Sequence, residues 1–105
     1  MLAPGHTFGL RIQGDSLGGA GLRPGDDVLF VQQTNVARGQ LACVMLSDEA
    51  AVRYVYADLE YVQLVASSAA TPAVLLRAGD WNPRFVLGVA VGMLRRYDPP
   101  AAPPA

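Results

Sequence analysis

The pattern of apolar and polar residues predicts strands throughout the chain, and helical periodicity is hard to find. Phe8, Leu10 and Ile12 alternate with more polar neighbours, which indicates a half-buried strand at about residues 7–13. Further strands are predicted over residues 27–31, 39–46, 51–56, 61–65, 73–76 and 85–94. Several short strands separated by closely spaced turns are typical of an all-β barrel or sandwich.

Turn residues separate these predicted strands. Pro24-Gly25 precedes the second strand, and residues 47–49 connect the two strands of a hairpin. Gly88 and Gly92 interrupt the longest apolar run, which is too short to span a membrane and therefore predicts a buried, bent strand. Residues 98–105 contain four prolines and are expected to be a disordered tail, so that residues 1–97 form the single folded domain.

The composition limits the possible functions. A chain of 105 residues, half of them apolar, supports one core and one domain. The net charge of −1 and the lack of a basic run argue against a nucleic-acid surface. Arg95-Arg96 is the only basic pair, and we interpret it as solvated charge at the end of a strand.

The compartment follows from the start of the chain and from its cysteine usage. The first ten residues lack the basic and apolar regions of a signal peptide, and no segment is long enough to span a membrane. Cys43 is the only cysteine, so an internal disulfide is impossible. We therefore expect a soluble, cytoplasmic protein without membrane contact, with Cys43 as a small core residue.

The stretch from Gly14 to Asp26 is the strongest candidate for chemistry. Gly14-Asp15-Ser16 ends the first predicted strand and presents the hydroxyl of Ser16 at a turn, followed by a glycine-rich run. Gly-Asp-Ser is also ordinary turn chemistry, so this motif alone does not establish a site. A phosphate-binding loop does not fit, because such a loop needs a lysine before the serine or threonine and the chain has no lysine.

The string Gly-Asp-Ser-Leu also occurs in the GDSL esterases. Those enzymes need a histidine after the serine as general base, and the only histidine of this chain, His6, precedes it. A third possibility is a serine–lysine dyad, in which a desolvated, neutral lysine accepts the proton of the serine.

The chain resembles the C-terminal domain of the LexA-type repressors, a family of all-β Ser-Lys peptidases that includes phage repressors and UmuD. The resemblance rests on four segments in the same order and covers residues 7–97. These are FGLRIQGDSL, GLRPGDDVLFV, the pair GQLACVML and AAVRYVY, and FVLGVAVGMLRRY. It implies a bent, partly closed sheet with a projecting hairpin or short second sheet.

The chain departs from the family at two positions. Leu17 replaces the methionine that usually follows the serine, which is a nearly isosteric change. Arg53 lies 37 residues after Ser16, where the family has its catalytic lysine. A guanidinium keeps its proton in proteins, so Arg53 is a poor general base, and we expect a degenerate dyad of Ser16 and Arg53 without cofactor or metal.

The resemblance implies a role in dimerisation of a transcriptional regulator of the SOS type. The expected interface is the closing strand around residues 89–94, in an isologous dimer that needs only one apolar edge strand. The same segment is also compatible with a core strand of one subunit. DNA contact is expected only through a domain absent from this chain, and the alternative function is slow self-cleavage by an active peptidase.

Overall fold

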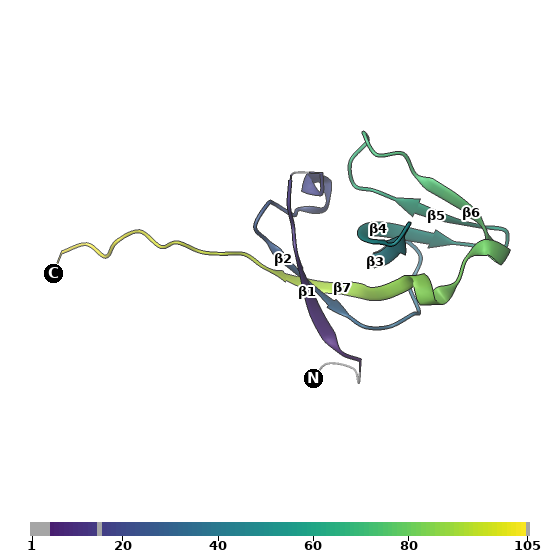
Figure 1. Ribbon diagram of the computed structural model, residues 1–105. Coiled ribbons are helices and arrows are strands. Elements are labelled where there is room, and N and C mark those ends of the chain that lie inside the picture. Colours follow the sequence, from purple (N-terminus) through teal and green to yellow (C-terminus); the bar gives the residue numbers. More distant parts are fainter. Residues whose placement is uncertain (1–4, 15, 105) are drawn as a thin grey trace.

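Seven antiparallel strands form one bent sheet in the order β1-β2-β7-β3-β4-β5-β6 (Figure 1). The computed structural model describes residues 5–14 and 16–104. The strands are β1 Thr7–Arg11, β2 Asp27–Val31, β3 Gln40–Leu46, β4 Glu49–Ala57, β5 Tyr61–Val65, β6 Val74–Arg77 and β7 Val86–Leu94. Three short 3₁₀ segments are η1 Gly18–Ala20, η2 Ala78–Asp80 and η3 Pro83–Phe85, and the described residues contain no α-helix. The predicted all-β fold class is confirmed, with a sheet that is not closed.

The hairpin of β3 and β4 turns on two residues. Ser47 and Asp48 have φ values of 47° and 67°, and the strands pair from Leu46 and Glu49 onwards. A two-residue turn with positive φ at both positions has the twist that antiparallel strands need. The hairpin that carries Arg53 is therefore part of the main sheet and does not form a second one.

Strand β7 joins the two halves of the sheet. Its first residues pair with β3 and its last residues pair with β2. The register shifts once along each partner, so that Leu87 and Val91 have no direct partner across the ladder. Such bulges bend a strand, which confirms the bent strand expected from the sequence. Gly88 lies inside the bend, where an added Cβ would come within 2.8 Å of the carbonyl oxygen of Val31.

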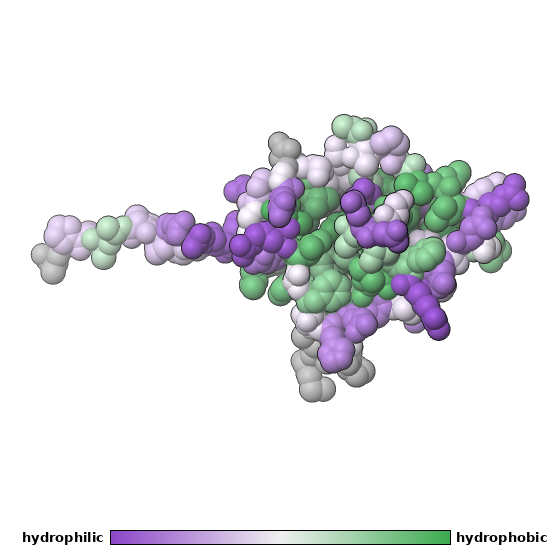
Figure 2. Space-filling model, viewed as in Figure 1, coloured by the Kyte–Doolittle hydropathy of each residue, from purple (hydrophilic) through white to green (hydrophobic). Residues whose placement is uncertain are grey.

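The core consists of two clusters of buried apolar residues. One contains Ala42, Val44, Val55, Val62, Leu64, Val86 and Val89. The other contains Ile12, Leu22, Val28, Phe30, Cys43 and Val52. Figure 2 shows that apolar side chains also reach the visible surface of the body, with hydrophilic side chains around them. Cys43 belongs to the second cluster, which confirms its prediction as a core residue, and burial raises the pKa of its thiol.

The two ends of β7 differ in exposure. Val86 and Val89 are buried, whereas Val91 is 53% and Leu94 60% exposed. The prediction of an edge strand is wrong, because β7 lies between β2 and β3 and the edges are β1 and β6. After β7 the chain runs away from the sheet without regular structure up to residue 104 (Figure 1). That this tail is disordered, and that the domain ends at residue 97, remain predictions.

No helix in the described part of the chain has the length and apolar character needed to cross a membrane.

Candidate functional site

The serine loop, residues 14–22, connects the end of β1 to the turn before β2. The base of the loop is closed by hydrogen bonds from Ile12 N to Asp26 O at 2.8 Å and from Gly25 N to Ile12 O at 2.9 Å. Leu17 packs against the second core cluster, so the residue in the family's methionine position has an apolar role. Ser16 itself is exposed. Asp15, the middle residue of the Gly-Asp-Ser motif, lies outside the described residues.

The segment after β5, residues 66–68, lies against the serine loop. Ser67 Oγ donates a hydrogen bond to the carbonyl oxygen of Ser16 at 2.9 Å. An added Cβ at Gly19 would lie 2.9 Å from the carbonyl oxygen of Ser67, so the two backbones approach as closely as glycine allows. This contact could not be predicted from the sequence, because a Ser-Ala-rich stretch has the composition of any surface loop.

Arg53 lies on β4 opposite Ala42 of β3 and is half-buried. Its Nη1 donates a hydrogen bond to the carbonyl oxygen of Val52 at 2.8 Å. Its Nε is buried and has no hydrogen-bond partner. A buried donor without an acceptor is costly, so this arginine is held at its position without full compensation of its polar atoms.

The carbonyl of Val52, which accepts that bond, faces the β5 side of β4. The direction follows from Val55, whose carbonyl oxygen accepts a hydrogen bond from the N–H of Gly39 just before β3 and therefore faces β3. Carbonyl groups alternate in direction along a strand, so the carbonyl of Val52, three residues earlier, faces the other side. The β4–β5 ladder ends at the pair Tyr54–Val65. The guanidinium of Arg53 therefore bonds to the β5 side of β4, beyond the end of the β4–β5 ladder.

Segment 66–68 contacts the serine loop, whereas the side-chain hydrogen bond of Arg53 is to the backbone of its own strand. The hydrogen bonds of the described residues do not include one between the two side chains. Arg53 shares its face of β4 with the first core cluster, whereas the serine loop packs on the second. The predicted direct pairing of Ser16 and Arg53 in one cleft remains a prediction.

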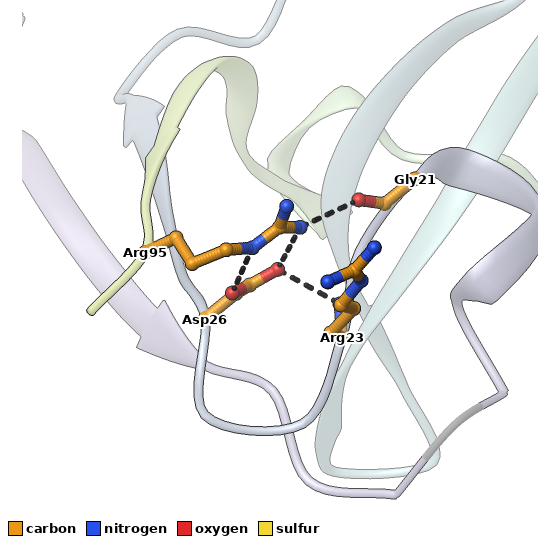
Figure 3. A network of polar contacts seen from close by, with 4 residues as sticks. All are labelled: Gly21, Arg23, Asp26 and Arg95. Carbon is orange, nitrogen blue, oxygen red and sulfur yellow. Dashed lines mark hydrogen bonds and ion pairs between the residues drawn. The ribbon is translucent and has the colours of Figure 1, made fainter. Parts of the chain in front are cut away.

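A second polar feature, which the sequence did not reveal, lies at the C-terminal end of the serine loop (Figure 3). The side chain of Asp26 is only 2% exposed. Its carboxylate accepts hydrogen bonds from Arg95 Nε at 2.9 Å and Arg95 Nη2 at 2.8 Å, and from the backbone N–H of Arg23 at 2.8 Å. Arg95 Nη2 also donates to the carbonyl oxygen of Gly21 at 3.1 Å. The end of β7 is therefore tied to the end of the serine loop.

These donors hold the pKa of Asp26 at about 2, below its ordinary value of 3.8, with the side-chain bonds from Arg95 as the largest cause and the Arg23 N–H next. The interpretation of Arg95 as solvated edge charge is wrong. The reason is that its carboxylate partner lies 69 positions earlier in the chain, so no local pattern indicates the pair.

The chain belongs to the Peptidase S24-like family, whose model matches residues 1–91. Its expected similarity to the C-terminal domain of LexA-type repressors is confirmed. It is 38% identical over 91 residues to a LexA repressor of Sorangium cellulosum, an alignment covering 87% of this chain and 40% of that protein. A LexA repressor of Anaeromyxobacter dehalogenans is 37% identical over 90 residues, covering 86% of this chain and 40% of that protein. A LexA repressor of Syntrophobacter fumaroxidans is 32% identical over 97 residues, covering 92% of this chain and 46% of that protein. The chain thus spans less than half the length of these curated relatives.

Proposed function

We propose that this domain serves a transcriptional repressor chiefly by forming a homodimer, and that its peptidase dyad is degenerate. The observation that carries the proposal is the exposure of Val91, Met93 and Leu94 at the end of a strand whose first half is buried. Apolar residues gathered at one exposed end of a structure are a common feature of interaction surfaces. In a two-fold interface both subunits use the same patch, so the apolar area that is buried is twice that of one patch.

For the whole protein, we propose a regulator that binds DNA. DNA contact is made by a domain outside this chain, in keeping with relatives that are more than twice as long and are called repressors. The protein acts in the cytoplasm, in a response of the SOS type. No cofactor or metal enters the proposal.

Loss of peptidase activity is proposed from the chemistry of Arg53. A serine hydroxyl is a weak nucleophile unless a neighbouring base accepts its proton. A buried lysine can become neutral and do so, whereas a guanidinium remains protonated. The bond from Arg53 to the Val52 carbonyl supports this assignment, because the guanidinium is engaged as a donor at the edge of β4.

Dimerisation is tested by sedimentation of the domain at micromolar concentrations. We expect a dimer for the wild type and a monomer for Val91→Asp, because an unpaired charge in an apolar contact is costly. Leu75→Asp is the matched control, since Leu75 is equally apolar and 63% exposed but lies on β6. A wild type that stays monomeric, or a Val91→Asp variant that remains dimeric, contradicts the proposed interface.

The degenerate dyad is tested with a supplied linker peptide and mass spectrometry. We expect no cleavage by the wild type at neutral pH and cleavage by Arg53→Lys, because a desolvated lysine can lose its proton. Ser16→Ala in the Arg53→Lys background should abolish that cleavage, which separates it from a contaminating protease. Wild-type cleavage at neutral pH that depends on Ser16 would establish the alternative, an active self-cleaving peptidase.

A further inference from the structure

Four arginines from distant parts of the chain line one cleft next to the end of β7. The cleft has a volume of about 590 Å³. Its lining includes Arg11, Arg23, Arg95 and Arg96, together with Leu94. Figure 2 shows hydrophilic side chains gathered where the tail leaves the body. Half of the eight basic residues of the chain thus meet at one place, although the sequence shows no basic run.

The cleft carries an excess of positive charge. Arg11 forms an exposed ion pair with Asp27 at 3.1 Å, and Arg95 pairs with the buried Asp26 at 2.8 Å. Two carboxylates against four guanidinium groups leave a formal charge of +2, in a chain whose total is −1. Among the described residues, neither Arg23 nor Arg96 has a carboxylate partner. The guanidinium of Arg23 projects past the Asp26 network without a bond to the residues drawn beside it (Figure 3).

The cleft offers side-chain donors and few free backbone donors. The N–H groups of Arg23, Gly25 and Asp26 are all used, on Asp26 Oδ2, Ile12 O and Arg23 O. A compact phosphate is usually held by backbone N–H groups that converge on it, and this turn has none to spare there. Guanidinium groups match carboxylates and phosphates in bidentate geometry, and in this cleft Arg11 and Arg95 already bind two carboxylates in that way.

The cleft also has an apolar side. Leu94 is 60% exposed, and Pro24 also lines the cleft. The volume is within the range of sites that hold ligands much larger than a single ion. Two unpaired arginines and an exposed leucine are together complementary to a peptide that carries carboxylates beside an apolar residue.

We infer that this cleft binds an acidic peptide segment of a partner protein, with Arg23 and Arg96 holding its carboxylates and Leu94 an apolar side chain. The inference does not depend on the dyad. It shares Leu94 with the proposed dimer interface, but Arg23 and Arg96, on which its test acts, have no part in that interface. Attraction by exposed arginines is screened by salt, so binding should weaken as ionic strength rises.

The test is fluorescence anisotropy with a labelled short peptide of alternating glutamate and leucine, and the glutamine version of the peptide as its neutral counterpart. We expect the wild-type domain to bind the acidic peptide and not the neutral one. The double variant Arg23→Glu/Arg96→Glu should bind at least about tenfold more weakly, because it removes both unpaired guanidinium groups. Arg77→Glu/Arg84→Glu makes the same change in net charge on exposed arginines outside the cleft and should bind like the wild type.

Three outcomes would overturn the inference. Equal weakening by both double variants would mean that net charge alone attracts the peptide. Tighter binding of a short single-stranded oligothymidylate than of the peptide would assign the cleft to nucleic acid, and full competition by millimolar inorganic phosphate would assign it to a small anion. Circular dichroism of each variant shows whether the sheet is retained, and a reversal at Arg96 alone serves as the second test if the double variant unfolds.

Discussion

The two ends of the stretch from Gly14 to Asp26 differ in how they are held. At the start, Ser16 is exposed, and its side chain has no hydrogen-bond partner among the described residues. At the end, Asp26 is buried and accepts three hydrogen bonds, two of them from Arg95 at the far end of the chain. The residue with candidate chemistry is therefore left open to solvent, whereas the residue next to β2 is fixed.

The difference shows where the serine loop is anchored. Loops that carry function are commonly positioned by a rigid scaffold while their tips remain accessible. Here the scaffold acts at the base, through Asp26 and the Ile12 hydrogen bonds, and at one side, through Ser67. The path of the loop is therefore held by contacts that do not involve the side chain of Ser16.

The largest expected effect comes from removing the charge of Asp26. Asp26→Asn replaces a buried carboxylate with a neutral amide, so Arg95 loses its charged partner. We expect Tm to fall by roughly 10 °C. Asp27→Asn is the matched control, because Asp27 also pairs with an arginine but at the surface, and such pairs contribute little. Differential scanning calorimetry of both variants measures the contrast, and equal losses would mean that burial of Asp26 is not what matters.

The same contrast should depend on pH. The pKa of Asp26 is lowered to about 2 in the folded protein from 3.8, so its stabilisation is complete above about pH 4 and is lost as pH falls towards 2. The stability difference between wild type and Asp26→Asn should therefore shrink over that window. Urea midpoints measured from pH 5 to pH 2 test this, and a constant difference would contradict the pairing.

A smaller effect is expected on the serine side of the comparison. Gly19→Ala places a Cβ 2.9 Å from the carbonyl oxygen of Ser67, and we expect a loss of about 1–2 kcal/mol as the two segments move apart. Gly18→Ala is the control, because an added Cβ there meets nothing within 4 Å. Urea unfolding compares the two; a Gly19→Ala variant as stable as Gly18→Ala would show that segment 66–68 does not support the serine loop.

The sequence predicted the strands well because their signal is local. All seven predicted strands are present, with ends that differ by about two residues or less. The hairpin turn at Ser47-Asp48 was predicted over residues 47–49, since short polar residues between two apolar runs favour a turn. The 3₁₀ segments η2 and η3 were not predicted, because three residues carry no periodicity.

The features that were missed depend on contacts between distant residues. Each of these features joins segments that are too far apart in the sequence for a local pattern to reveal. They are the pair of Asp26 and Arg95, the contact of Ser16 with Ser67, and the arginines of the cleft. The central position of β7 was missed for a related reason, since a final strand has no local sign that it inserts between β2 and β3. The side-chain relation of Ser16 to Arg53 was predicted from family resemblance, and it stands as a prediction.

The open sheet has a consequence for the behaviour of the protein at high concentration. Its two unpaired margins, β1 and β6, are only five and four residues long. The unpaired backbone groups of an exposed edge strand can pair with further copies of the chain and lead to fibres. Short edge strands that carry charged residues disfavour this pairing. Arg11 is the last residue of β1 and Arg77 the last residue of β6, so each edge strand ends with a charged residue. These short, charged edge strands therefore work against the addition of further copies to the open sheet.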